Sequence, residues 1–279
     1  MGDVTDGGCT QQANRSRRSH GLGLESLAVN GYRATAVTMQ EQLREDTDGA
    51  ILFDAALSPQ VDADWFAPEY WRGQGALRTQ AGGRGGVAVI ATPAGECVLR
   101  HYRRGGMVAA LMGDRYLWHG AARTRSFAEL RLLDTIARLG LPGPLPVAAR
   151  YQRHGLFYRA DLMTGLIADA QTLAQCLAAG KLDTELGEEV GALVARFHRE
   201  GIWHADLNAH NVLVTPTALY LIDFDRGRIR PPAEGWRLAN LQRLRRSLLK
   251  LGAAAQGEAA FDAAIWNSLT YGYERTLSA

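Results

Sequence analysis

The fold of this chain is decided by two stretches, HADLNAHN at residues 204–211 and IDFD at residues 222–225. Between them lie two short apolar runs, separated by a turn that contains Pro216. An apolar run, a proline turn and a second apolar run together predict a β-hairpin. The hairpin would place Asn211 at its entrance and Asp223 at its exit, so that their side chains converge on one cation. Carboxylate and amide oxygens suit Mg²⁺, which shares its remaining coordination positions with phosphates and water.

The spacing of these polar residues is that of a kinase catalytic loop followed by a metal-binding segment. The general pattern is His-x-Asp-x-x-x-x-Asn, then a hairpin and then Asp-Phe-Gly. His204, Asp206 and Asn211 match it in type and spacing. Asp223 begins the second element, although Asp225 stands where many protein kinases have glycine. The alternative is a hairpin on an exposed face flanked by two acidic loops, but the joint match of several spaced residues favours a phosphotransferase.

The composition is compatible with such a fold. The chain has 279 residues, of which 47% are hydrophobic, so one large or two-lobed domain with an ample core is expected. The formal net charge of +2 does not indicate a nucleic-acid-binding protein. Lys181 and Lys250 are the only lysines among 31 basic residues. Arginine suits phosphate and carboxylate oxygens, but a bias toward arginine codons explains most of this excess.

Several features bear on the compartment. The three cysteines are scattered without metal-type spacing, which indicates a reducing compartment and no disulfide framework. No run of about 18 apolar residues is present, so no membrane span is expected. Met1–Asn30 lacks an apolar region, so no signal peptide is expected. Residues 1–38 are rich in Gly, Ser and Arg and are predicted to form a disordered tail, and Met39 is a candidate start of the protein.

The segment after the tail predicts an antiparallel sheet that binds a nucleotide. The run GGRGG at residues 82–86 leads into a strand at Val87–Ile90. A flexible glycine turn lets backbone N–H groups approach phosphates closely, which makes Gly83, Arg84 and Gly85 candidate ATP-binding residues. A glycine-rich hairpin turn without a ligand is the more common explanation of such a run.

A basic residue on the next strand strengthens the nucleotide-binding interpretation. Kinases place a lysine there to hold the α- and β-phosphates, and Arg100 occupies the corresponding place in the strand predicted at Cys97–Tyr102. Its guanidinium can grip phosphate oxygens through two nitrogens, whereas the alternative is an exposed strand arginine. Glu129 lies in an amphipathic helix predicted from Ser126 to about Gly140. It either closes a capping box with Ser126 or pairs with the phosphate-binding base, and we favour the pairing.

The chain becomes mainly helical after this sheet. The lobes are predicted to join at a hinge containing Asp161 and Met163, where backbone groups can contact an adenine. A long helix is predicted at Asp183–Glu200, with apolar residues on one face. The sequence therefore predicts an α+β, bilobal protein-kinase-like fold. It has an antiparallel-sheet N-lobe at residues 39–161 and a mainly helical, small C-lobe at residues 162–279.

The segment beyond the second acidic cluster favours a small or lipid-linked acceptor. It contains neither Ala-Pro-Glu nor a long phosphorylatable segment, both of which a protein-substrate platform would need. A basic amphipathic helix is predicted from Trp236 to Leu251, and its cations, Arg243, Arg245 and Arg246 among them, would contact an anionic membrane surface. The alternative is that its leucines are buried in the core, which still leaves the arginines able to face lipid.

From about Met39 to its end, the chain resembles the lipopolysaccharide core kinase family, and within it the 3-deoxy-D-manno-octulosonic acid (Kdo) kinases. Three blocks carry the resemblance: LRHYRRGG at residues 99–106, HADLNAHN at residues 204–211 and LIDFDRG at residues 221–227. The resemblance implies transfer of the ATP γ-phosphate to the 4-hydroxyl of a Kdo sugar on a lipid A precursor. It also implies a peripheral location at the cytoplasmic face of the inner membrane of a Gram-negative bacterium.

The resemblance also assigns roles to individual residues. It makes Asp206 the catalytic base, Asn211 and Asp223 the metal ligands, and Asp225 the family's own variant of the glycine position. Arg100 stands at the phosphate-binding basic position. The implied cofactors are ATP and Mg²⁺, and the implied partners are the Kdo-bearing lipid A precursor and an anionic membrane surface. Neither nucleic acid nor an obligate protein partner is indicated.

Two interpretations from other classes stay open. A small-molecule phosphotransferase of the aminoglycoside or choline kinase type shares the catalytic-loop pattern. A cationic acceptor would need an acidic pocket, however, and the neighbourhood here is rich in arginine, as at Arg103, Arg104 and Arg226. The other alternative is a kinase-shaped binding module without activity. The missing lysine favours it, and the intact catalytic and metal-binding residues oppose it.

Overall fold

The structure is a computed structural model, which describes residues 1–2, 28–29, 32–33, 38–81, 87–103 and 113–279. The chain divides into two compact units, Met1–Thr35 and Ala36–Ala279. In the first unit, β1 (Ala28–Val29) pairs antiparallel with β2 (Tyr32–Arg33). The prediction of a disordered tail is therefore wrong for these two strands, and most of the remaining residues of 1–38 lie outside the described part.

The second unit begins with an eight-stranded sheet that pairs in the order β3-β4-β9-β10-β7-β6-β5, with β8 added on β10. Every pairing in it is antiparallel, as predicted. The strands are β3 (Glu41–Asp46), β4 (Gly49–Asp54), β5 (Leu77–Ala81), β6 (Val87–Thr92), β7 (Gly95–His101), β8 (Tyr116–Leu117), β9 (Pro146–His154) and β10 (Phe157–Gly165).

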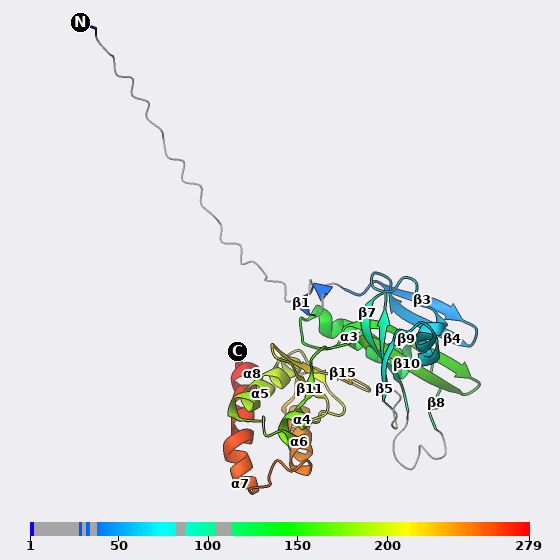
Figure 1. The fold of residues 1–279 in the computed structure, drawn as a ribbon. Helices are drawn as coiled ribbons and strands as arrows, with labels where there is room; N and C mark the ends of the chain where they lie inside the picture. The colour runs from blue at the N-terminus through cyan, green and yellow to red at the C-terminus, as the bar shows by residue number, and fades with distance from the viewer. Residues whose placement is uncertain (3–27, 30–31, 34–37, 82–86, 104–112) are drawn as a thin grey trace. The chain divides into compact units, whose positions relative to one another are not determined.

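Both faces of this sheet are covered, which explains why β4 contains a continuous apolar run at residues 50–53. Ala50 and Leu52 of β4 belong to one buried cluster with Phe127 of α3 (Arg125–Arg138). The alternate residues Ile51 and Phe53 belong to a second cluster, which also contains residues of η1 (Ala63–Phe66) and α1 (Pro68–Gly73). Because side chains alternate across a strand, one strand serves two cores. Figure 1 shows α3 lying along the sheet.

The rest of the second unit is mainly helical, as predicted, and carries the predicted hairpin. The short η2 (Ala121–Arg123) precedes α3 and lies outside this part. The helices of this part are α4 (Leu173–Ala178), α5 (Thr184–Arg199), α6 (Glu234–Lys250), α7 (Glu258–Phe261), the π-helical η3 (Asp262–Trp266) and α8 (Asn267–Ser278). Its strands are β11 (Gln171–Thr172), β12 (Ile202–Trp203), β13 (Val212–Val214), β14 (Leu219–Leu221) and β15 (Arg228–Ile229). Asp183 caps α5 by accepting a hydrogen bond from the backbone N–H of Leu186 at 2.9 Å.

The boundary between sheet and helices lies later than predicted. Asp161 and Met163 pair with β7 on one side and with β9 on the other. Met163 is fully buried. Their backbone groups are therefore part of the sheet, and a boundary between residues 161 and 162 would cut β10 in half. The sheet runs to Gly165, so the connector to the helical part begins at Leu166.

Helix α6 buries most of its apolar stripe, in agreement with the alternative interpretation of its leucines. Leu241, Leu244 and Leu248 are buried in the core, whereas Leu238 is 45% exposed. The leucines are therefore mostly unavailable to a bilayer. Among the described residues, no helix combines the length and the apolar character needed to cross a membrane.

Two glycines set the distance between α5 and α8, which lie side by side (Figure 1). A Cβ added to Gly191 of α5 would lie 1.9 Å from the carbonyl oxygen of Leu269. A Cβ added to Gly272 of α8 would lie 2.1 Å from the carbonyl oxygen of Glu188. Only a residue without a side chain permits this approach, because the obstructing atoms belong to the backbone.

Replacing Gly191 by alanine should therefore destabilise the protein. The helices must separate or shift to admit the methyl group, and overpacking of this kind costs about 1–3 kcal/mol. Gly235→Ala in α6 is the matched control, because a Cβ there meets nothing within 4 Å; it should be neutral or stabilise by up to about 1 kcal/mol. Urea unfolding of both variants measures the difference, and equal stability of the two would contradict this account of the α5–α8 contact.

Candidate active site

The hairpin brings the predicted metal ligands to the same end. Val212 pairs with Leu221 and Val214 pairs with Leu219 in an antiparallel register. One step beyond β13 and β14, the backbone N–H of Ile222 donates to the carbonyl oxygen of Asn211 at 3.0 Å. Asp223 follows immediately. The structure thus places Asn211 at the start of the hairpin and Asp223 at its end, as the sequence predicted.

His204 joins the catalytic loop to the end of the hairpin. Its Nε2 donates to the carbonyl oxygen of Ile222 at 2.9 Å, and its Nδ1 accepts the backbone N–H of Asp206 at 3.1 Å. A neutral imidazole with its proton on Nε2 makes both bonds, whereas a protonated ring could not accept at Nδ1. Burial lowers the pKa of His204, which favours this neutral form. The histidine therefore positions Asp206 and holds it against the segment that leads to Asp223.

The side chain of Asn240, in α6, makes two hydrogen bonds to the backbone of the same loop. This residue was not identified from the sequence. Its amide nitrogen donates to the carbonyl oxygen of His204 at 3.0 Å, and its Oδ1 accepts the backbone N–H of His204 at 3.3 Å. The Asn240 side chain is buried. No local pattern reveals this role, because its partner lies 36 residues earlier in the chain.

Asp206 projects from this fixed loop with its side chain 55% exposed. Its backbone carbonyl accepts the amide of Asn211 at 3.0 Å, which ties the predicted base to a predicted metal ligand. Asn208 donates to Oδ2 of Asp206 at 3.2 Å, and Nη1 of Arg243 donates to Oδ1 at 3.0 Å. Arg243 was expected at a membrane surface; the structure instead places it against the predicted base.

Arg100 bridges two carboxylates: Glu129, with which the sequence analysis paired it, and Asp223, which was predicted only as a metal ligand. Its Nη2 donates to Glu129 at 2.6 Å, and its Nη1 donates to Asp223. The Glu129 side chain is only 2% exposed, and it also accepts a hydrogen bond from the hydroxyl of Tyr102. Burial raises the pKa of Glu129 against the opposing effect of Arg100. Tyr102 was missed as a site residue, although it stands two positions after Arg100 and period-two alternation could have found it.

The capping-box alternative for Glu129 is wrong. Helix α3 begins at Arg125, with Thr124 at its N-cap and no side-chain cap hydrogen bond. Ser126 therefore lies inside the first turn, and its hydroxyl donates to the carbonyl oxygen of Arg150 at 2.9 Å. The serine anchors α3 to β9, which leaves Glu129 free to pair with Arg100.

The backbone around Asp223 is held in an unfavourable conformation. Asp223 has φ of 63° and Arg226 has φ of 59°, and for a residue with a Cβ this region costs roughly 1–2 kcal/mol. Between them, Phe224 is fully buried and stacks on Phe197 at a ring-centroid distance of 5.6 Å. Burial of this ring holds the segment in place, so Asp223 turns away from the core toward Arg100. Strain of this kind is often found at functional sites.

Asp225, at the position where many protein kinases have glycine, makes a bidentate ion pair. Arg125 donates from Nε to Oδ1 at 2.7 Å and from Nη2 to Oδ2. Arg125 is the first residue of α3, and Glu129 lies one turn further along the helix. The helix is therefore joined twice to the segment 223–225, once directly and once through Arg100. Arg125 was missed by sequence reasoning because its partner is 100 residues away.

The remaining predicted ATP-binding residues divide into two groups. Gly83, Arg84 and Gly85 lie outside the described residues, in the connection between β5 and β6. The prediction that Asp161 and Met163 form the adenine hinge is wrong, since both lie within the sheet. The carboxylate of Asp161 is instead structural, because it accepts from Arg150 at 2.9 Å and contacts Nδ1 of His101 at 2.7 Å. The hydrogen bond between Asp161 and His101 raises the pKa of the histidine.

The donor atoms present are compatible with Mg²⁺. Asn211 uses its amide nitrogen on Asp206 and keeps its carbonyl oxygen, and Asp223 engages Arg100 through Oδ1 and keeps Oδ2. Within the described residues, no three His, Cys, Asp or Glu side chains gather into a metal cluster. The protein would therefore supply few ligands, in a coordination sphere of the kind that Mg²⁺ completes with water and phosphate oxygens.

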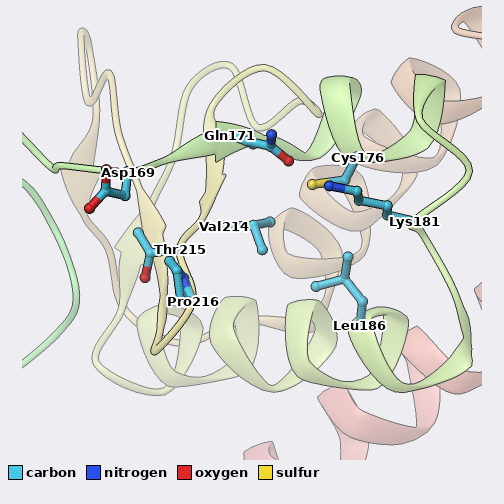
Figure 2. A pocket seen from close by; sticks show the side chains of 8 residues that line it. All are labelled: Asp169, Gln171, Cys176, Lys181, Leu186, Val214, Thr215 and Pro216. Atoms are coloured by element: carbon cyan, nitrogen blue, oxygen red, sulfur yellow. The ribbon is translucent and has the colours of Figure 1, made fainter.

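A pocket of about 390 Å³ lies at the other end of the hairpin. Figure 2 shows its lining, which includes Lys181, Cys176 and the turn residues Thr215 and Pro216. The turn joins the ends of β13 and β14 opposite to those that carry Asn211 and Asp223. None of the predicted site residues lines this pocket, so it is separate from the candidate active site.

The antiparallel sheet with one long helix against it, followed by a helical part that carries the catalytic loop, defines a kinase-like phosphotransferase. The chain belongs to the lipopolysaccharide kinase (Kdo/WaaP) family, whose family model matches residues 68–273. It is an enzyme of the phosphotransferase class, as predicted.

Curated relatives agree with this assignment. The chain is 51% identical to a "3-deoxy-D-manno-octulosonic acid kinase" of Stenotrophomonas maltophilia (strain R551-3), over 73% of this chain and 81% of that protein. It is 46% identical to the kinase of the same name from Xylella fastidiosa (strain M12), over 77% of this chain and 85% of that protein. The recognition made from the three sequence blocks is confirmed.

A solved structure supports the fold. "WaaP in complex with acyl carrier protein" superposes with a TM-score of 0.51 at 17% sequence identity, covering 81% of this chain and 88% of that one. At this identity the likeness shows the fold alone. The predicted α+β, kinase-like architecture is therefore confirmed.

The Arg125–Asp225 pair should be coupled energetically. Its side chains are only 22% and 20% exposed, and a bidentate charge-assisted pair of this kind is worth about 1.5–3 kcal/mol. Arg125→Gln and Asp225→Asn should each lower the free energy of unfolding, and the double variant should lose clearly less than their sum.

The Arg131–Glu41 pair is the matched control, since its side chains are 40% and 43% exposed. Its coupling should stay below about 1 kcal/mol. Denaturant unfolding of the two double-mutant cycles gives both values. Additive effects at Arg125 and Asp225 would mean that the pair does not join α3 to the segment 223–225.

Proposed function

We propose that this kinase transfers the γ-phosphate of ATP, with Mg²⁺, to the 4-hydroxyl of a Kdo residue carried by a lipid A precursor. The observation that carries the proposal is the position of Asp206. It is exposed on a loop fixed by His204 and Asn240, joined to Asn211, and accompanied by Arg243. The names of the two relatives, which specify Kdo, support the identity of the sugar.

Each residue of the candidate active site would have its own role in the reaction. Asp206 would accept the proton of the acceptor hydroxyl and orient its oxygen in line with the transferred phosphoryl group. Arg100, held by Glu129, would neutralise charge on the phosphates. Asn211 and Asp223 would hold Mg²⁺, which would neutralise the charge that develops during phosphoryl transfer. His204 and Asn240 would hold the base and the two metal ligands in fixed positions relative to one another.

The charges around Asp206 favour an acidic acceptor over a cationic one. Arg243 contacts its carboxylate, and Arg226 and Arg228 are exposed near Asp223 in the sequence. A cationic acceptor such as an aminoglycoside would be repelled by these charges, whereas a sugar acid with neighbouring phosphates would be attracted. This argument supports the lipopolysaccharide acceptor over the small-molecule alternative.

Turnover measurements test this function directly. The enzyme should phosphorylate a Kdo-bearing lipid A precursor in the presence of ATP and Mg²⁺, and should leave aminoglycosides unmodified. Asp206→Asn should lower kcat by about 10²–10⁴-fold, the usual contribution of a general base. The control Asp262→Asn changes a carboxylate that binds Arg245 and should keep wild-type turnover. Phosphorylation at a different hydroxyl, or only of aminoglycosides, would refute the proposal.

We also propose that the enzyme works as a peripheral protein at the cytoplasmic face of the inner membrane, where its lipid-linked acceptor would be found. Helix α6 supplies the best-placed cations, although two of the three arginines first expected to contact lipid have protein partners instead. Arg243 contacts Asp206, and Arg245 pairs with Glu258 and Asp262. Arg246 and Lys250 are exposed on the same helix and are the better candidates for contact with anionic lipid.

Co-sedimentation with anionic vesicles tests the membrane contact. Each cation near an anionic surface contributes about 1 kcal/mol, so changing Arg246 and Lys250 together to Gln should weaken binding by about 30-fold at low salt. Arg199→Gln is the single-charge control, because Arg199 is paired with Glu200 near the end of α5. If the double change left vesicle binding unaltered, α6 would not be the contact.

A further inference from the structure

Both carboxylate oxygens of Asp206 accept hydrogen bonds from neighbouring side chains. Oδ1 accepts a hydrogen bond from Arg243 at 3.0 Å, and Oδ2 accepts one from Asn208 at 3.2 Å. A general base must present an oxygen within hydrogen-bond reach of the proton that it accepts. Each carboxylate oxygen can accept two hydrogen bonds, so neither contact by itself blocks the acceptor's hydroxyl. A charged donor stabilises the ionised form of a carboxylate, however, so Asp206 accepts the acceptor's proton more readily once a cationic donor has left it.

The contact from Arg243 is the one that can be released. Asn208 is held close to the aspartate, because its amide also donates to the backbone carbonyl of Asp206 at 2.9 Å. Arg243, by contrast, comes from α6 and reaches Asp206 through a single nitrogen, the one contact found for its guanidinium among the described residues. Its side chain is 47% exposed and that of Asp206 is 55% exposed. An exposed pair of this kind is weak and easily exchanged.

We propose that Arg243 is the residue that recognises the carboxylate of the acceptor sugar, and that it leaves Oδ1 of Asp206 to do so. The proposal rests on the function proposed above, since Kdo carries its carboxylate and its 4-hydroxyl on C2 and C4 of the same ring. An arginine beside the base is thus suited to hold the carboxylate while the hydroxyl approaches Asp206. The planar guanidinium binds carboxylates through two nitrogens, one more than it uses on Asp206.

The exchange leaves Arg243 paired with a carboxylate throughout, so its cost in free energy is small. Arg243 pairs with a carboxylate before and after the acceptor binds, and Asp206 exchanges an arginine nitrogen for the acceptor's hydroxyl. In the transfer step, a bond forms between the acceptor oxygen and the γ-phosphorus, and the bond between that phosphorus and the β,γ-bridging oxygen breaks. The hydroxyl proton passes to Oδ1 of Asp206. An acceptor without a carboxylate would leave Arg243 on Oδ1, so the same arginine selects the substrate and exposes the base.

The test compares two acceptors with two enzymes. The acceptors are the Kdo-bearing precursor and the same molecule with its C1 carboxylate converted to the neutral amide. The wild-type enzyme should prefer the acid by about 10- to 100-fold in kcat/KM, as expected for loss of a charge-assisted hydrogen bond. Arg243→Gln should lose most of this preference, because its activity on the acid falls while its activity on the amide is unchanged or rises. The KM for ATP should stay unaltered.

Control variants keep the result interpretable. Arg199→Gln removes an arginine whose side chain is equally exposed, at 47%, and should retain the full preference for the acid. Arg243→Lys keeps the charge but loses the two-nitrogen fork, so its preference should be intermediate. If Arg243→Gln turns over too slowly to measure, Arg243→Lys still gives the ratio of kcat/KM between the acid and the amide.

The outcomes separate this inference from the proposed function. If wild-type enzyme does not phosphorylate the Kdo acceptor, the proposed function fails. If wild-type enzyme phosphorylates it and Arg243→Gln lowers activity on acid and amide by the same factor, the function stands and the inference is refuted. Arg243 would then act on Asp206 alone.

Discussion

The bridge from Arg100 to Glu129 and Asp223 is the interaction on which the rest of the site depends. It joins three elements that are far apart in the chain: the interior strand β7, the helix α3 and the segment after the hairpin. Glu129 is buried, so leaving its carboxylate without a cation would be costly. Arg100 satisfies that requirement and reaches Asp223 at the same time, which couples the position of the helix to the position of a predicted metal ligand.

Arginine suits this bridge better than lysine would. A planar guanidinium can donate to two carboxylates and a phenol in fixed directions, whereas an ammonium group is a compact point charge. Arg100 does this with Glu129, Asp223 and Tyr102. The second connection, from Arg125 to Asp225, explains why an acidic residue occupies the position that is glycine in many protein kinases. Together the two arginines fix α3 at both ends of its first turn.

The catalytic loop is positioned by a different means, through buried polar groups. His204 and Asn240 satisfy the backbone groups of the loop, and the ring of Phe224 lies 4.9 Å from the imidazole of His204. Buried polar groups of this kind are costly when unpaired, so a fully paired set specifies one arrangement. The rigid loop then presents Asp206 to solvent, where the acceptor and Arg243 can both reach it.

Much of this could be predicted from the sequence, because the deciding signals are local. The hairpin follows from two apolar runs around Pro216, and its strands carry Asn211 and Asp223 to one end by geometry alone. The pairing of Arg100 with Glu129 was also predicted, because kinases pair a basic residue on this strand with a glutamate on the neighbouring helix. The hinge was placed too early because the apolar residues of β10 give no sign of where its pairing stops; β7 and β9, distant in sequence, decide that.

The sequence by itself determined the fold class and the family, and it predicted the catalytic loop and the pair Asn211 and Asp223 as metal ligands. Only the tertiary structure decided which arginines belong to the site. Arg243 and Arg245 are two residues apart on one helix, yet one contacts Asp206 and the other contacts Glu258 and Asp262. Helical spacing separates their directions, but the partner that each meets is set by elements packed from elsewhere in the chain. A long-range ion pair leaves no local pattern, which is why Arg125, Asn240 and Arg243 became visible only in the folded molecule.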